Sequence, residues 1–332
     1  MKEGFIQHDG MVVERGKFNH VMALSLDPTT NYHEGLVRCV VGRSGDITKL
    51  GNVDRSELHL VRGDSLEQFK ILGKINVQDE IEIVKSLGSD LEFMGLEDPD
   101  IWIDPDDGKT HVYFTIPLRD NYKKYTHVHL GHAEGSGLDS LRMTGALLSP
   151  TPTNKRGAKE LSIAPINRDG IRLNLIESQE SIGDTYYSTI MVAKAPNPRS
   201  DWKYGDVVFH PIKSEYAWIG GHASPGPLLP RTFIDIGEDR LVGIINGRER
   251  DAADRVTRGI FSVGLMIYNY EEGKIEWVSE RPIIQDTEAR TITFASQFIE
   301  TTQGQGILYA HVDDSFVRAY TLDSSAIKSF IP

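Results

Sequence analysis

The stretch FMGLEDPDIWID places acidic side chains inside a run that is otherwise apolar and typical of a β-strand. Glu97, Asp98 and Asp100 surround Pro99. A solvated turn is one explanation, because Asp-Pro-Asp is common in turns and acids gather at strand ends. The other is a carboxyl group held at the mouth of a site, where burial or neighbouring charge raises its pKa so that it can donate a proton.

Histidines offer a second kind of chemistry. HVHLGH places His127 and His129 on one face of a predicted strand, with His132 nearby, a spacing that suits Zn²⁺ or another divalent ion. A third ligand on the same face is lacking, so we expect strand histidines and no metal site, and we expect no cofactor. His222 lies in the Gly-rich segment GGHASPG, which could bring its ring to a sugar or a phosphate.

The elements that must position these residues are strands. Short runs rich in β-branched and aromatic residues recur along the chain, among them LVRCVV, HVYFTI, HVHLGHA, TIMVAKA, FSVGLMIYN and GILYAHV, and Gly, Pro, Asn and Asp separate them. Helical periodicity is weak, with candidates only at 65–69 and 139–143. An all-β chain of this length hides its sheet edges as a barrel, a sandwich or a propeller, and the pattern alone does not choose among these.

Charge and composition exclude several classes of partner. The 332 residues include 36 basic and 48 acidic side chains, a net charge of −12, which repels nucleic acid and anionic membranes. The single cysteine, Cys39, lies in an apolar run and is expected to be a small buried hydrophobe. No signal-like or membrane-spanning apolar stretch is present, so we expect a soluble, cytoplasmic protein; a mature form that had lost a signal peptide would look the same.

The acidic stretch and several later segments, in chain order, resemble glycoside hydrolase family 130, the β-mannoside phosphorylases and mannosidases that share a five-bladed β-propeller. GLEDPD at 95–100 is similar to the family motif G-x-E-D-P-R, in which the aspartate after the glutamate is the general acid. The resemblance implies that Asp98 is the general acid. It also implies an all-β, five-bladed β-propeller formed by residues 1–332 as a single domain.

Other matched segments imply a sugar site whose residues come from several blades, as the axial funnel of a propeller requires. KFNHVMAL, LVRCVV and AKELSIAP are similar to the F-N-P, L-L-Y-R-A and K-D/N-x-x-x-x-P segments, and WIGGHASPGPLLPRT to the I-G-x-G-P-P-P-I-x-T loop. GIINGRE stands where Y-H-G is expected, and GILYAHVDD resembles Y-Y-G-A-A-D. With His222 included, the expected substrate-binding residues are Asn19, Arg38, Lys159, His222, Asn246 and Asp314.

Departures from the family pattern bear on the reaction. Asp100 replaces the arginine that closes the acidic motif, and Asn246 replaces the histidine of Y-H-G. An acid where a phosphate dianion should bind costs about 1 to 4 kcal/mol. We therefore expect hydrolysis of β-mannosides or related oligosaccharides. Phosphorolysis with inorganic phosphate is the alternative, because a cationic pocket could be rebuilt from Arg38, Lys159, Arg231, Arg248 and Arg250.

Inverting hydrolysis needs a second carboxylate to activate water, roughly 6.5 to 9.5 Å from the acid. The sequence offers three candidates for this base and does not rank them: Glu177, Glu180 and Glu215. A non-catalytic sugar-binding propeller is the alternative from another class, since a fold alone implies no chemistry. The complete GLEDP motif favours the enzyme, because a lectin needs no protonated carboxyl group.

Overall fold

The computed structural model describes residues 4–49, 51–183, 185–250 and 259–332, and most of its regular structure is antiparallel β-sheet. Blade 1 contains β3 (His20–Leu26), β4 (Glu34–Ser44), β5 (Val53–Ser65) and β6 (Gln68–Lys74), with β2 (Val13–Glu14) beside β6. Blade 2 contains β8 (Glu97–Ile103), β9 (Thr110–Asp120), β10 (Tyr125–Gly135) and β11 (Arg142–Leu148), with β7 (Glu92–Phe93) beside β9.

The remaining strands form three more groups of four. Blade 3 contains β12 (Lys159–Ser162), β13 (Arg172–Ile182), β14 (Thr185–Ala195) and β15 (Lys203–Phe209). Blade 4 contains β16 (His222–Leu228), β17 (Arg240–Arg248), β18 (Phe261–Asn269) and β19 (Lys274–Val278), and joins blade 3 through a single parallel pair between β14 and β16. Blade 5 contains β20 (Thr293–Thr302), β21 (Gln305–Val312), β22 (Phe316–Asp323) and β1 (Phe5–Gln7).

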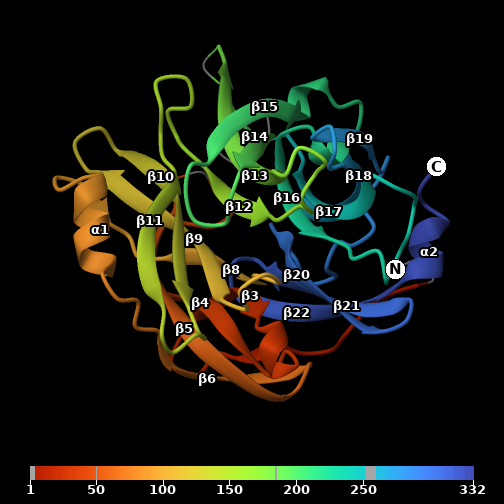
Figure 1. The fold of residues 1–332 in the computed structure, drawn as a ribbon, viewed down its shortest axis with the longest axis horizontal. Coiled ribbons are helices and arrows are strands. Elements are labelled where there is room, and N and C mark those ends of the chain that lie inside the picture. The colour runs from red at the N-terminus through yellow and green to blue at the C-terminus, as the bar shows by residue number, and fades with distance from the viewer. Residues whose placement is uncertain (1–3, 50, 184, 251–258) are drawn as a thin grey trace.

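The five blades stand around a common axis (Figure 1). The first strand of each blade, β3, β8, β12, β16 or β20, faces the middle and contacts the first strands of its neighbours. Each of the five blade interfaces also has its own apolar core, for example Leu36 and Leu58 of blade 1 against Val112 and Phe114 of blade 2. The expected all-β, five-bladed propeller is therefore confirmed.

Blade 5 is completed by the first strand of the chain. Strand β1 pairs with β22 in antiparallel register, with Phe5 opposite Leu322. Phe5 is almost fully buried and packs edge-on against Phe330, beyond helix α2 (Ser324–Lys328). Segments from both ends of the described chain thus share one sheet and close the ring, and the short β1 covers the edge of β22.

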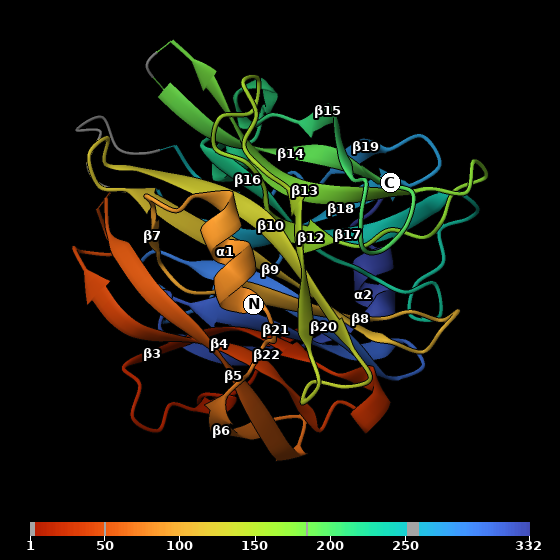
Figure 2. The same ribbon diagram turned by 60° about the vertical axis from the view of Figure 1, so that its left-hand side comes forward.

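The helix candidates at 65–69 and 139–143 are wrong, because the first forms a β5–β6 turn and the second leads into β11. The longer helix, α1 (Glu80–Leu87), lies outside blade 2 (Figure 2). Ile83, Val84 and Leu87 pack against the blade, but the helix is only eight residues long, so sequence periodicity did not single it out. Three short 3₁₀ turns complete the regular structure: η1 (Pro28–Thr30), η2 (Pro211–Lys213) and η3 (Ala217–Ile219). No helix in the described part of the chain is long and apolar enough to cross a membrane.

Candidate active site

A cavity of about 970 Å³ opens at the propeller axis, and side chains from all five blades line it. Asp98, Lys159 and Glu177 are among the lining residues, as are His222 and Asp314. A concave site with convergent charged groups at the axis is the usual place for a small-molecule site in a propeller. The cavity is therefore the candidate active site.

Three inner strands share the same backbone irregularity, and two of them use it to aim a carboxyl group at this cavity. The pairing of β3, β8 and β12 with the next strand shifts register at a bulge, and each bulge contains a residue with positive φ: Ala23 (51°), Asp98 (48°) and Glu160 (49°). A bulge re-aims a side chain and is common next to active sites. Asp98 and Glu160 line the cavity from this position, and blade 1 has an alanine there. A residue before proline is usually extended, and the sequence predicts this for Asp98, which precedes Pro99. That prediction is wrong, because the bulge outweighs the local restriction and gives Asp98 a positive φ.

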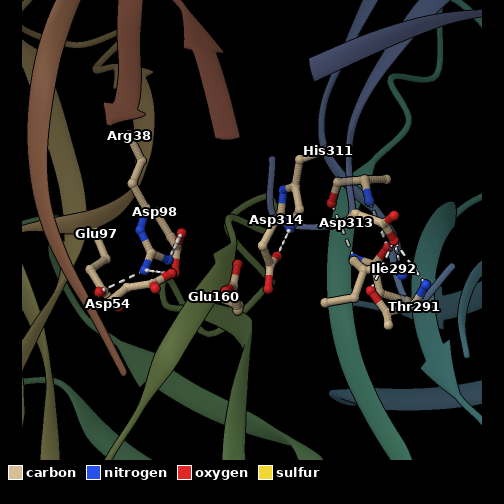
Figure 3. A network of polar contacts seen from close by, with 12 residues as sticks. Arg38, Asp54, Glu97, Asp98, Glu160, Thr291, Ile292, His311, Asp313 and Asp314 are labelled. Atoms are coloured by element: carbon tan, nitrogen blue, oxygen red, sulfur yellow. Dashed lines mark hydrogen bonds and ion pairs between the residues drawn. The ribbon is translucent and has the colours of Figure 1, made fainter. Parts of the chain in front are cut away.

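Arg38 on β4 organises the acidic motif (Figure 3). Its Nη1 lies 2.9 Å from Asp98 Oδ1, its Nη2 lies 2.7 Å from Glu97 Oε1, and Asp54 Oδ2 is 3.7 Å away. Burial opposes ionisation of Arg38, but these carboxylates outweigh it and raise its pKa. Arg38 is thus a fixed cation that selects which carboxyl groups beside it stay ionised.

The surroundings of Asp98 and Glu160 shift the pKa values of these two carboxyl groups in opposite directions. Burial raises the pKa of Asp98, but the charges of Arg38 and Lys159 outweigh it and hold that pKa below its usual range. Burial raises the pKa of Glu160 well above its usual range, and the Asp98 charge and a hydrogen bond with Asp98 raise it further. Two carboxyl groups whose surroundings push their pKa values apart are the signature of an acid and an ionised partner. These pKa directions favour Glu160 over Asp98 as the group that carries the proton.

A second cluster occupies the wall formed by blades 3 and 4. Lys159 Nζ lies 3.4 Å from Glu160 Oε1 and 3.5 Å from Glu177 Oε2, and His222 Nε2 lies 3.2 Å from the same Glu177 oxygen. Burial opposes ionisation of Glu177, but Lys159 and His222 lower its pKa below its usual range. Burial lowers the pKa of His222 to about 4, so its ring is neutral at neutral pH. Glu177 is the ionised carboxylate on this wall.

Asp314 enters the cavity from the turn after β21, where its φ is 47°. His311 Nε2 lies 3.2 Å from Asp314 Oδ1, and this contact outweighs burial and lowers the pKa of Asp314 to about 2. The preceding Asp313 has a different role, since it accepts hydrogen bonds from Thr291 and Ile292 and holds the loop before β20 (Figure 3). The two adjacent aspartates thus divide into one cavity residue and one structural residue.

Several sequence candidates lie elsewhere. Asn19 is exposed outside the cavity lining, and its carbonyl oxygen accepts a hydrogen bond from Arg15. Glu180 is largely exposed and 3.5 Å from His210, and Glu215 is exposed. Neither glutamate lines the cavity, so Glu177 is the candidate base that the fold brings to the site.

The two changed positions of the family pattern are also outside the lining. Asn246 is fully buried on β17, donates to the Ala295 carbonyl oxygen at 3.1 Å and accepts from the Ala295 N–H at 2.8 Å. Its amide joins blades 4 and 5, so it does not face a ligand. Asp100 lies opposite Tyr113 in the β8–β9 pair, where burial raises its pKa to about 7. Neither residue contributes charge to the cavity wall.

Sequence analysis did not select Glu160, although it follows Lys159 directly. Only the structure reveals its role, because Glu160 and Asp98 occupy equivalent bulges on the inner strands of adjacent blades. The cavity also contains Asp54, His311 and aromatic side chains that no motif marks, the aromatic ones being Tyr186, Tyr187, Phe261 and Phe294. Aromatic faces beside carboxylates suit a carbohydrate, which presents both C–H surfaces and hydroxyl groups.

Known structures share this fold. The β-1,2-mannobiose phosphorylase from Listeria innocua is 14% identical, with 99% of this chain and 93% of that chain covered and a TM-score of 0.62. A mannose phosphorylase from Leishmania mexicana is 11% identical over 96% and 89% of the two chains, with a TM-score of 0.54. An endo-arabinase from Bacteroides thetaiotaomicron is 11% identical over 95% and 97%, with a TM-score of 0.56.

The chain has the propeller fold of these enzymes. No protein-family profile and no curated protein sequence matches it. At such low identities the structural likeness establishes the fold alone, so the chemistry has to be argued from the cavity itself.

Proposed function

We propose that the protein is an inverting glycoside hydrolase that acts on β-mannosides or related β-linked oligosaccharides. The observation that carries this proposal is the Asp98–Glu160 pair, two buried carboxyl groups from adjacent blades, one ionised and one protonated, in the axial cavity. A sugar-binding protein without catalytic activity has no need of a buried protonated carboxyl group, whereas glycosidic cleavage requires one.

The acid in this proposal is Glu160, with Asp98 as its ionised partner. Sequence resemblance assigned the acid to Asp98, but the Arg38 ion pair keeps Asp98 ionised before substrate enters. Glu160 holds the proton that the leaving oxygen needs, and Asp98 stabilises that proton by its charge and hydrogen bond. The bulges of β8 and β12 supply the geometry that brings the two groups together.

The base in this proposal is Glu177, which is ionised and buried in the same cavity. Its Oε2 and Glu160 Oε1 lie 3.5 and 3.4 Å from Lys159 Nζ, so these oxygens are at most about 7 Å apart. This upper limit meets only the lower end of the inverting range of about 6.5 to 9.5 Å and includes the retaining separation of about 5 to 5.5 Å, so the anomer released decides the stereochemistry. Lys159 binds both carboxyl groups and keeps their spacing fixed.

Phosphorolysis is the second candidate, favoured by Arg248 and Arg250 in the cavity lining near Lys159 and by the Leishmania phosphorylase, which was solved with a phosphate ion. Arg231 does not line the cavity. The lining has five Arg and Lys against six Asp and Glu residues; Glu160 is protonated and burial raises the pKa of Glu97 to about 7, so at neutral pH the fixed charges sum to between 0 and +1. A phosphate dianion would leave uncompensated negative charge, which favours water.

Product analysis tests the proposal. Purified protein is incubated with a panel of β-1,2-, β-1,3- and β-1,4-linked mannosides, with and without 10 mM phosphate, and products are followed by NMR. We expect free mannose of inverted anomeric configuration at a rate independent of phosphate. Formation of mannose 1-phosphate would show that the protein is a phosphorylase and not a hydrolase. Saturable binding of the same sugars without any product would identify a sugar-binding propeller.

A further inference from the structure

A second polar cluster lies at the opposite end of strand β8 from the axial cavity. Asp104 follows β8, Asp107 lies in the turn that leads to β9, and His111 is on β9. One potential ligand atom from each residue lies within 4.8 Å of the other two. Asp104 lies six positions after Asp98, roughly 20 Å along an extended strand, so the cluster is distinct from the axial cavity.

The ring of His111 has an unsatisfied nitrogen that faces this cluster. His111 is fully buried, and its Nε2 atom has no hydrogen-bond partner. The nearest carboxylate oxygen of the cluster, Asp104 Oδ2, is 3.9 Å away, beyond hydrogen-bond distance. A buried nitrogen without a partner costs about 1 to 3 kcal/mol unless something binds it.

A chain of hydrogen bonds fixes the orientation of this ring. His111 Nδ1 lies 2.8 Å from His132 Nε2, and His132 Nδ1 lies 2.6 Å from the Thr144 hydroxyl, which donates to the His132 carbonyl oxygen at 3.3 Å. All three contacts are satisfied when both histidines carry their proton on Nδ1. His111 Nε2 is then a bare lone pair directed at two carboxylates, and a bound cation would satisfy the ring nitrogen and both carboxylates together.

The surrounding charges leave room for such a cation. Lys109 and Arg199 lie 3.9 and 3.6 Å from Asp107, but each is closer to Glu134, at 3.2 and 3.4 Å. Three carboxylates, those of Asp104, Asp107 and Glu134, thus face two cations. Asp104 Oδ1 already accepts from the Asp106 N–H, which holds the Asp104 side chain in place.

We propose that Asp104, Asp107 and His111 bind a divalent transition-metal ion of the zinc type, which fastens the β8–β9 turn to blade 2. One imidazole nitrogen and two carboxylate oxygens are ligands of that class, with solvent in the remaining positions. His132 serves as the outer-sphere acceptor that orients the ligating imidazole, a role that carboxylates or carbonyl groups usually fill. The ion is structural, and its binding is independent of the proposed hydrolase activity.

Metal binding to the purified full-length protein without an affinity tag tests this inference. After removal of ions with EDTA, Zn²⁺, Mn²⁺, Ca²⁺ and Mg²⁺ are titrated separately by calorimetry, and Tm is measured with each. We expect one Zn²⁺ per chain, with micromolar or tighter Kd, and a rise in Tm of several degrees. Co²⁺ should give visible absorption bands typical of nitrogen and oxygen ligands.

Variants decide whether the ion is at this cluster. Asp107→Asn changes an exposed ligand and should weaken Zn²⁺ binding at least tenfold while the protein still folds. Asp106→Asn is the matched control in the same turn, and its affinity should equal that of the parent protein. No binding below millimolar Zn²⁺, equal binding by Asp107→Asn and parent, or a preference for Ca²⁺ over Zn²⁺ would each overturn the inference.

Discussion

At the scale of single residues, the division of protons among the carboxyl groups of the cavity decides the chemistry. Arg38 lies within 3 Å of both Asp98 and Glu97. It holds the pKa of Asp98 low, whereas burial outweighs Arg38 at Glu97 and raises that pKa to about 7. Glu160 lies next to the ionised Asp98 and keeps its proton. Proximity to Arg38 therefore distinguishes two acids that occupy equivalent bulges.

Replacing the proton donor tests this assignment. Glu160→Gln should lower kcat/KM on an unactivated disaccharide by about 10² to 10⁴-fold, the usual contribution of general acid catalysis. An aryl glycoside with a good leaving group should lose much less, because its departure needs no proton. Glu180→Gln, an exposed change on the same blade, is the control and should match the parent protein. An equal loss on both substrates would assign Glu160 to binding instead.

The pH dependence of kcat/KM gives an independent test. Because Glu160 must be protonated, activity should fall as pH rises through its pKa, which lies above the usual value of 4.5. Asp98→Asn removes the charge and the hydrogen bond that raise this pKa, so the alkaline limb should move to lower pH. Glu177 has a lowered pKa and should not produce an acidic limb near pH 5. An unmoved alkaline limb in Asp98→Asn would contradict the proton-sharing pair.

At the scale of the elements, the bulges explain both the success and the failure of sequence analysis. Strand alternation predicts β9 and β10 correctly, and the acidic motif leads to Asp98. Pattern analysis assumes regular strands, so it cannot predict that Asp98 and Glu160 both leave the regular backbone and meet. Asn19 and Asn246 were selected by resemblance to segments whose side chains point elsewhere in this fold.

We expect the Asn246 side chain to stabilise the fold and not to bind substrate. Asn246→Ala leaves the N–H and carbonyl groups of Ala295 without partners between β17 and β20, at a cost of about 2 to 4 kcal/mol in free energy of unfolding. Its KM should stay within twofold of the parent protein. Asn19→Ala is the exposed control, with a change of at most about 0.5 kcal/mol. Urea unfolding followed by fluorescence measures both, and a raised KM for Asn246→Ala at unchanged stability would restore it as a substrate contact.

At the scale of the whole molecule, stability depends on five interfaces that form a closed ring. The interface between blades 4 and 5 includes Phe5, which belongs to the first described strand. Phe5→Ala should therefore lower the free energy of unfolding by about 3 to 5 kcal/mol, as for a buried aromatic residue. Ile6→Ala on the same strand removes a side chain that is 61% exposed and should cost at most about 0.5 kcal/mol. Equal effects of the two changes would show that β1 does not hold the ring closed.

The pairing of β1 with β22 also sets an order of events during biosynthesis. The ribosome releases Phe5 long before its partner Leu322, which follows 317 positions later in the chain. Blades 1 to 4 can assemble while the nascent chain grows, whereas blade 5 has to wait, with the apolar face of β1 exposed to chaperones or to other nascent chains. Contacts this distant in sequence form slowly, because a large loop must close first. A newly made chain is thus most prone to aggregation in the interval before β1 pairs with β22 and the ring closes.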